Sequence, residues 1–251
     1  ALADLIRSDT TLVSIMAVNN EIGSIQPIEA ISELLADKPT ISFHVDAVQA
    51  LAKIPTENYL TDRVDFATFS SHKFHGVRGV GFVYIKSGKR IMPLLTGGGQ
   101  EGDYRSTTEN VAGSAATAKA LRLSMEKLDI FTNKTGQMKS VIRQALLDYP
   151  DIFVFSDEDD FAPHILTFGI KGVRGEVIVH AFEDYDIFIS TTSACSSKAG
   201  KPAGTLIAMG VDKDKAQSAV RLSLDLENDM SQVEQFLTKL KLIYNQTRKV
   251  R

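Results

Sequence analysis

Apolar runs and stretches with helical spacing alternate along the first part of the chain. Leu12 to Val18 and Ile41 to Asp46 are short segments dominated by apolar residues, a pattern typical of buried strands. Between them, Pro27 suits the first turn of a helix, and the apolar residues that follow recur at helical spacing. This order of strand, helix and strand predicts a βαβ unit with a parallel sheet.

The alternation continues through the rest of the chain. Further strands are predicted at Val64 to Phe69, Gly79 to Ile85, Ile152 to Phe155, His164 to Phe168, Asp186 to Ile189 and Val220 to Leu224. Helices are predicted at Val111 to Leu128, Asn133 to Leu147 and Gly175 to Glu183. Ser231, with Glu234 three residues later, matches a capping box that opens a final helix. We expect a larger domain, residues 1–128, and a smaller α/β domain, residues 129–251.

Composition narrows the class of protein. The 251 residues are 43% hydrophobic and 24% charged, an ordinary balance for a globular protein with a sizeable core. The net charge of −3 argues against a dedicated nucleic-acid surface, and no apolar run approaches the roughly 18 to 20 residues of a membrane span. One cysteine leaves no internal disulfide and fits a reducing compartment. We therefore expect a soluble, cytoplasmic protein without direct contact to nucleic acid or membrane.

Polar residues gather where two of the predicted strands end. Lys73 follows one strand in the sequence Ser70-Ser71-His72-Lys73, and Asp46 ends the strand before it. Parallel strands bring their carboxyl ends to one edge of a sheet, where ligands usually bind. A lysine there can form a Schiff base with a carbonyl cofactor, and a carboxylate can keep a pyridine nitrogen protonated. The pair indicates a pyridoxal cofactor.

Two other patterns indicate binding sites less specifically. His44, His72 and His75 offer three imidazoles for zinc, but H-E-x-x-H or comparable spacing is absent, so we expect no metal site. His44 is expected to be a hydrogen-bonded residue of its strand. The backbone of glycines 97–99 suits a phosphate, but the GxxxxGK[ST] pattern of a nucleotide P-loop is absent, and a flexible hinge is the simpler explanation.

The only cysteine and an unusual arginine lie in the smaller domain. Cys195 has Ser, Thr, Lys and Gly neighbours, a composition typical of an exposed loop rather than of a buried cysteine. Lys198 and Lys201 favour its thiolate, the nucleophilic form. Arg221 interrupts an apolar strand, where a guanidinium is costly unless it is paired. An internal salt bridge or a bidentate grip on a substrate carboxylate would explain it.

These motifs closely resemble those of the cysteine desulfurases, a group within the aminotransferase class V family. The resemblance rests on four segments: Asn19-Asn20-Glu21-Ile22-Gly23, His44-Val45-Asp46-Ala47-x-Gln49, Ser70-x-His72-Lys73 and Ser193-Ala194-Cys195-Ser196. It implies a PLP-dependent transferase of fold type I, where PLP is pyridoxal 5′-phosphate. Such a protein has a large three-layer α/β/α domain with a mainly parallel sheet, here present in part, and a smaller α/β C-terminal domain that carries the cysteine loop.

The resemblance also implies a role for each matched residue. The implied catalytic residues are Lys73, as Schiff-base lysine and general base, and Cys195, as sulfur acceptor. The residues implied to bind the cofactor are Asn20, Asp46, Gln49, Ser70, His72, Lys73 and Thr108. Asn20 and Arg221 are implied to bind the substrate. Thr108 is implied to reach the cofactor of a partner subunit, so a homodimer is expected. This segment departs from the family pattern at Gly102-Asp103 and at Thr107, which replaces a glycine.

The implied reaction converts L-cysteine to L-alanine and leaves a persulfide on Cys195. The sulfur would pass to an acceptor protein, either an iron–sulfur cluster scaffold or an enzyme of tRNA thiolation or thio-cofactor biosynthesis. Two alternatives remain: another fold-type I PLP enzyme, such as a selenocysteine lyase or an aminotransferase, and a non-catalytic fragment or scaffold with an incomplete site. Since the chain resembles roughly the last two-thirds of a cysteine desulfurase, we expect an N-terminally truncated chain. Without the phosphate-cradling helix and the ring-stacking histidine of the family, it should bind PLP weakly and turn over little.

Overall fold

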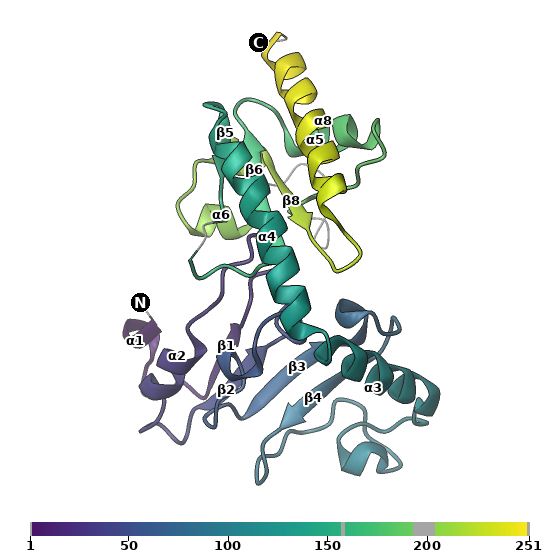
Figure 1. The fold of residues 1–251 in the computed structure, drawn as a ribbon. Helices are drawn as coiled ribbons and strands as arrows, with labels where there is room; N and C mark the ends of the chain where they lie inside the picture. The colour runs from purple at the N-terminus through teal and green to yellow at the C-terminus, as the bar shows by residue number, and fades with distance from the viewer. Residues whose placement is uncertain (1, 157–158, 193–203, 250–251) are drawn as a thin grey trace. The chain divides into compact units, whose positions relative to one another are not determined.

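The chain folds into two compact units. The computed structural model describes residues 2–156, 159–192 and 204–249 (Figure 1). The first unit contains residues 1–17 and 26–128, and the second contains residues 18–25 and 129–251.

Residues 18–25 join the second unit because of their hydrogen bonds. The backbone N–H of Ala162 donates to the carbonyl oxygen of Gly23 over 2.7 Å. A β-bridge next to it pairs Ser24 with Phe161. The sequence pattern places this segment among the elements of the larger domain, whereas its backbone pairing attaches it to residues much later in the chain.

The first unit is built on a four-stranded sheet with the order β1-β2-β3-β4 (Figure 1). The strands are β1 (Leu12–Met16), β2 (Ser42–Asp46), β3 (Phe66–Ser70) and β4 (Gly81–Ile85). The first three run parallel, and β4 pairs antiparallel with β3. Helix α2 (Ile28–Leu34) connects β1 to β2. This confirms the mainly parallel α/β sheet predicted from the sequence. The short helices α1 (Leu2–Leu5) and η1 (Thr56–Asn58) complete this part of the unit.

The two faces of this sheet differ in polarity because side chains alternate along each strand. One face is apolar and buried, and carries Val13, Phe43, Val45, Ala67 and Phe69. The other face is more exposed, and its polar side chains include Ser14, His44, Asp46, Thr68 and Ser70. The candidate residues at the ends of β2 and β3 therefore belong to the polar face.

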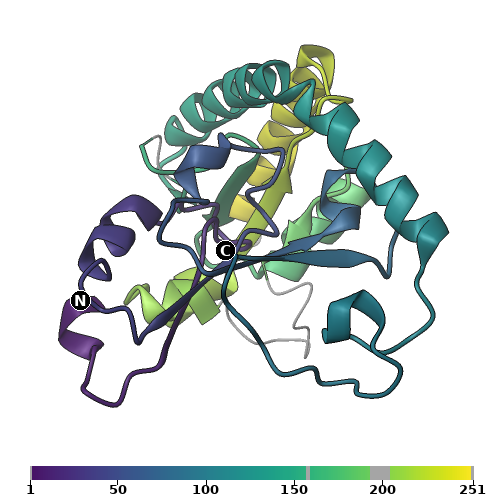
Figure 2. The same cartoon turned by 90° about the horizontal axis from the view of Figure 1, so that it is seen from below.

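A long connection of residues 86–110 joins β4 to helix α3 (Val111–Met125) (Figure 2, blue-green). It contains one short 3-10 turn, η3 (Gln100–Asp103). The side chain of Asn110 caps α3 by accepting a hydrogen bond from the N–H of Gly113 over 3.0 Å. Thr108 lies two residues before this cap and is exposed.

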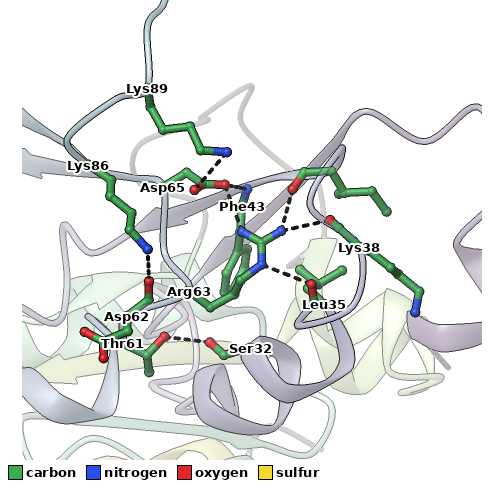
Figure 3. A network of polar contacts seen from close by, with 11 residues as sticks. Ser32, Leu35, Lys38, Phe43, Thr61, Asp62, Arg63, Asp65, Lys86 and Lys89 are labelled. Carbon is green, nitrogen blue, oxygen red and sulfur yellow. Dashed lines mark hydrogen bonds and ion pairs between the residues drawn. The ribbon is translucent and has the colours of Figure 1, made fainter.

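A network of polar contacts around Asp65 ties the start of β3 to the start of β2 (Figure 3). Asp65 is only 2% exposed, and its carboxylate accepts a hydrogen bond from the N–H of Phe43 over 2.9 Å. It also forms ion pairs with Arg63 (2.8 Å) and Lys89 (3.1 Å). The guanidinium of Arg63 further donates to three backbone carbonyl groups, those of Leu35, Lys38 and Ile41. The buried carboxylate and the guanidinium therefore compensate each other, as burial of charge requires.

The second unit contains a four-stranded antiparallel sheet with the order β5-β6-β8-β7. The strands are β5 (Ile152–Val154), β6 (Ile165–Ile170), β8 (Ala219–Ser223) and β7 (Ser190–Thr191). Helices α4 (Leu128–Leu147), α5 (Gly175–Glu183) and α8 (Met230–Lys249) pack against the sheet through one apolar core (Figure 1). Its buried members include Ile142, Phe168, Phe182, Leu222 and Phe236.

A second, smaller apolar cluster attaches residues 18–25 to the two short helices of this unit. Ile22 packs with Leu206 of α6 (Gly204–Ala208) and with Ala216 of α7 (Lys213–Gln217). Ile22 and Leu206 are almost fully buried, with exposed fractions of 1% and 0%. Apolar contacts therefore add to the backbone pairing that places this segment in the second unit.

One strand of the second unit differs from the sequence prediction. The strand expected at Asp186 to Ile189 is replaced by the two-residue strand β7, which begins at Ser190. Asp186 adopts a left-handed conformation, with φ of 57°, and closes the turn after α5. The chain consequently reaches the sheet later than the apolar pattern indicates.

The start of the final helix also differs from the prediction. The side chain of Asp229 accepts a hydrogen bond from the N–H of Gln232 (3.0 Å), and the side chain of Gln232 accepts one from the N–H of Asp229 (3.2 Å). This reciprocal pair is a capping box. The predicted pair of Ser231 and Glu234 is therefore wrong by two residues, because Asp229 is an equally good capping residue and stands earlier.

Candidate active site

Asp46 lies at the carboxyl end of β2, on the polar face of the first unit's sheet. It pairs in register with Thr68 of the parallel strand β3. One carboxylate oxygen, Oδ1, accepts a hydrogen bond from the N–H of Val48 over 3.0 Å, which fixes the side chain against the turn that follows. Gln49 is part of that turn and is half-buried, like Asp46. The carboxylate and the amide therefore stand close together in the chain, at one end of the sheet.

Lys73 lies in a short 3-10 turn, η2 (Ser71–Phe74), immediately after β3. It is half-buried, and its neighbour His72 is exposed. The turn ends at His75 in the left-handed conformation, with φ of 66°. Ser70 is the last residue of β3, and the turn follows it. Because β2 and β3 are parallel neighbours, this strand end lies next to the one that carries Asp46. The structure brings together the strand ends that the sequence analysis selected.

Two buried hydroxyl groups hold the turn that contains Lys73. The Oγ of Ser71 and the Oγ1 of Thr117, on α3, are joined by a hydrogen bond of 2.9 Å, and Ser71 is fully buried. Gly76 has no room for a side chain, since an added Cβ would lie 2.0 Å from the Oγ of Ser71. Another hydrogen bond, of 3.1 Å, runs from the Oγ of Ser124 to the carbonyl of Phe74. The sequence analysis missed Ser71 and Thr117 as supports of this turn.

His44 is part of a hydrogen-bonded row across three strands. Its Nδ1 lies 2.7 Å from the Oγ of Ser14, and its Nε2 lies 3.1 Å from the Oγ1 of Thr68. Burial lowers the pKa of His44, and the carboxylate of Asp46 opposes this shift only in part. The imidazole is therefore expected to be neutral at pH 7. This agrees with the prediction of a hydrogen-bonded strand residue.

Within the parts of the chain that the structure describes, no group of three or more His, Cys, Asp or Glu side chains is placed to hold a metal ion. Among the described helices, none is long and apolar enough to cross a membrane.

Arg221 and Asn20 meet in the second unit. Arg221 lies in β8, half-buried, and its Nη1 donates a hydrogen bond of 2.7 Å to the backbone carbonyl of Asn20. One partner of this guanidinium is thus a carbonyl group of the segment 18–25. The contact links the two residues that the resemblance assigns to substrate binding.

Two neighbours of Asn20 also make side-chain contacts that the sequence did not indicate. The carboxylate of Glu21 accepts a hydrogen bond from the N–H of Thr205 over 3.0 Å. Asn19 donates to the Oγ1 of the same Thr205 over 3.2 Å. No local pattern signals a contact between residues so far apart in the chain. Cys195, predicted as sulfur acceptor, lies outside the described residues.

Comparison with known proteins shows the family to which the chain belongs. Residues 1–236 match the aminotransferase class-V family. The chain belongs to this family. The resemblance found in the motifs is thereby confirmed.

Several relatives carry more specific names. The chain is 52% identical over 243 residues to a NifS/IcsS protein homolog of Lactobacillus delbrueckii subsp. bulgaricus, covering 96% of this chain and 63% of the relative. It is 36% identical over 253 residues to the cysteine desulfurase IscS of Clostridium botulinum, with coverage of 99% and 63%. The chain therefore spans about 63% of the length of the curated relatives it matches.

Solved structures agree with this placement. A NifS-like protein superposes with a TM-score of 0.88 at 37% identity, covering 97% of this chain and 64% of that one. A NifS-like protein from Rickettsia africae gives a TM-score of 0.85 at 28% identity, with the same two coverages. These neighbours confirm the fold-type I architecture predicted for the chain.

Proposed function

We propose that this protein is a PLP-dependent cysteine desulfurase that converts L-cysteine to L-alanine and transfers the sulfur to Cys195. The observation that carries the proposal is the placement of Asp46 at the end of β2 and of Lys73 directly after the adjacent parallel strand β3. Identity of 36% to a protein named cysteine desulfurase IscS supports the choice of this reaction within the family.

The polar residues of the first unit fit the chemical groups of PLP. The cofactor presents an aldehyde, a pyridine nitrogen, a ring oxygen and a phosphate. In the proposal these groups are held respectively by Lys73, by Asp46, by Gln49, and by Ser70 with His72. Asp46, Gln49, Ser70 and Lys73 are half-buried and His72 is exposed, so all five residues have accessible surface. When bound, PLP withdraws electrons from the substrate Cα, a chemistry that these side chains do not have themselves.

Protein side chains would move the proton and the sulfur. In the proposal, the Nζ of Lys73 removes the proton from Cα as general base. The thiolate of Cys195 attacks the substrate sulfur, so that an S–S bond forms while the Cβ–S bond breaks and its electron pair stays on Cβ. Protonation of Cβ and return of a proton from the Nζ of Lys73 to Cα complete alanine. The sulfur atoms are oxidised to the persulfide and the substrate carbon is reduced, so the reaction needs no further oxidant.

The proposal also assigns partners and a compartment. We propose a homodimer in which the exposed Thr108 reaches the cofactor of the partner subunit. We further propose that Cys195 passes its sulfur to an acceptor protein of iron–sulfur cluster assembly or of tRNA thiolation. A single cysteine in the chain fits a reducing compartment such as the cytoplasm.

The test of the proposed function is a stoichiometric measurement with L-cysteine. After addition of PLP, we expect one alanine for each cysteine consumed and a mass increase of one sulfur atom on the peptide that contains Cys195. The Cys195→Ala variant should bind PLP equally and gain no sulfur. Formation of a keto acid in place of alanine would indicate an aminotransferase. Consumption of cysteine without formation of alanine would refute the proposal.

Arg221→Lys tests the proposed grip on the substrate carboxylate. A lysine keeps the positive charge but loses the planar fork that binds a carboxylate through two hydrogen bonds. We expect KM for cysteine to rise roughly ten- to a hundredfold, the loss expected for a hydrogen bond to a charged group. Steady-state kinetics measures this effect. Arg174→Lys is the matched control, because Arg174 is an exposed arginine of the same unit; an equal rise in that variant would argue against a specific role for Arg221.

A further inference from the structure

Both described ends of the segment that contains Cys195 lie next to the contact between Arg221 and Asn20. At the upstream end, Ser190 of β7 pairs in register with Arg221 of β8. The residue that follows β7, Thr192, is buried, with 4% of its surface exposed. At the downstream end, α6 begins at Gly204, and Thr205 contacts the segment 18–25. The described residues on both sides of the segment that contains Cys195 therefore lie near Arg221 and Asn20.

The contact at Thr205 consists of two hydrogen bonds. Its backbone N–H donates to the Oε2 of Glu21 over 3.0 Å, and its Oγ1 accepts from the Nδ2 of Asn19 over 3.2 Å. The first N–H groups of a helix have no partner within the helix, so the carboxylate of Glu21 satisfies a group that α6 itself leaves open. The negative charge is also favourable at this end of a helix. Glu21 thus fixes Thr205, although the two residues are 184 positions apart.

Glu21 and Asn19 are themselves held firmly in place. The Oδ1 of Asn19 accepts hydrogen bonds from the N–H groups of Glu21 (2.8 Å) and Ile22 (3.0 Å). The Oγ1 of Thr167, on β6, donates to the carbonyl of Glu21 over 2.7 Å. Since Asn20 between them accepts from Arg221, every residue from Asn19 to Ile22 takes part in a described hydrogen bond of the second unit. This rigid segment presents its carboxylate in a fixed position.

We propose that Glu21 is a positioning residue for sulfur transfer, acting through Thr205 on the segment that contains Cys195. Asn19 supports the same contact. The role rests on the proposed desulfurase function, because it assigns Glu21 to the sulfur-transfer step. It separates the tasks of neighbouring residues: Asn20 contacts the arginine that is proposed to bind substrate, whereas Glu21 and Asn19 fix the chain ten positions after the proposed acceptor.

Three variants of the PLP-loaded protein test this role. Glu21→Ala removes the acceptor for the Thr205 N–H, whereas Glu21→Gln keeps an oxygen that can accept the same bond. Asp212→Ala is the matched control. Its carboxylate accepts hydrogen bonds from the N–H groups of Asp214 and Lys215 at the start of α7, the neighbouring short helix, so its loss removes a comparable cap without touching Thr205.

Amide hydrogen exchange is the readout that does not depend on activity. We expect faster exchange at Thr205 in Glu21→Ala, and exchange as in the parent in Glu21→Gln and Asp212→Ala. Amides of the core strands β6 and β8 should remain protected in all variants, which shows that the unit is folded. Unchanged exchange at Thr205 in Glu21→Ala would overturn the inference.

Steady-state kinetics with cysteine is the second readout. In Glu21→Ala we expect kcat to fall about tenfold, the loss typical of one hydrogen bond to a charged group, while KM stays within about twofold because the bond between Arg221 and Asn20 is kept. Glu21→Gln should restore most of kcat. If the parent forms alanine and the Glu21→Ala variant has the same kcat as the parent, the positioning role alone would be overturned. A parent that consumes cysteine without forming alanine would overturn the proposed function and this role with it.

Discussion

Replacing Lys73 by alanine is expected to lower the rate of alanine formation from cysteine by about 10³-fold, the range typical for loss of a general base. The lysine is proposed both to bind the PLP aldehyde and to take the Cα proton, so two contributions disappear together. Borohydride should fix PLP onto the parent chain at Lys73 and should not fix it onto the variant. Absorption spectra and peptide mass spectrometry after reduction measure this loss, and alanine assays measure the rate.

The structure argues that this variant will fold. The turn around Lys73 is held by other groups: the hydrogen bond between Ser71 and Thr117, and the backbone bond from the N–H of Gly76 to the carbonyl of Ser71 over 3.0 Å. Truncation of the Lys73 side chain leaves these contacts unchanged. Lys119→Arg, at an exposed position of α3, is the control and should keep full activity. If Lys73→Ala retained more than about a tenth of the parent rate, the assignment of Lys73 as general base would be wrong.

The sequence predicted the strand ends of the candidate site for a simple physical reason. Side chains at the carboxyl ends of neighbouring parallel strands meet at one edge of a sheet. Each strand was recognisable from its own residues, so Asp46 and Lys73 could be selected without knowledge of distant contacts. The register of β2 and β3, which pairs Asp46 with Thr68, confirms that the two strand ends are neighbours, while the roles of Asp46 and Lys73 stay predictions.

Contacts between residues far apart in the chain could not be predicted in this way. The hydroxyl pair of Ser71 and Thr117 and the bond between Glu21 and Thr205 depend on how separate elements pack, and nothing in the local pattern encodes them. For the same reason, the residues 18–25 were assigned by sequence to the elements around them, whereas their hydrogen bonds place them in the second unit.

Local chemistry also misled the prediction where two residues offered the same signal. Asp229 and Ser231 are both good helix-capping residues, and each has a Glu or Gln three positions later. Only the structure shows that the bonds form between Asp229 and Gln232. Capping patterns therefore identified the last helix but not its first residue.

Asp65→Asn is expected to lower the free energy of unfolding of the first unit by about 3 kcal/mol at pH 7, because removing one partner of a buried ion pair leaves the other charge uncompensated. The stranded charge is that of Arg63, whose side chain is only 17% exposed and lies in the network of Figure 3. Urea titration followed by circular dichroism measures the change. Asp62→Asn is the control, since Asp62 is exposed and the network contacts its backbone carbonyl, not its side chain.

The same variant should reveal the pH dependence of this network. Burial raises the pKa of Asp65, but the N–H of Phe43 and the charges of Lys89 and Arg63 outweigh it, so the pKa in the folded chain lies below its ordinary value. A carboxyl group of this kind stabilises the fold fully above its unfolded pKa of about 3.9 and loses that contribution as the pH falls through the lower folded value. The stability difference between the parent and Asp65→Asn should therefore be constant from about pH 6 to 8 and shrink below about pH 4. A difference that stayed constant into acid would mean that the ionised carboxylate of Asp65 does not stabilise the first unit, and that Arg63 is held by the three backbone carbonyls alone.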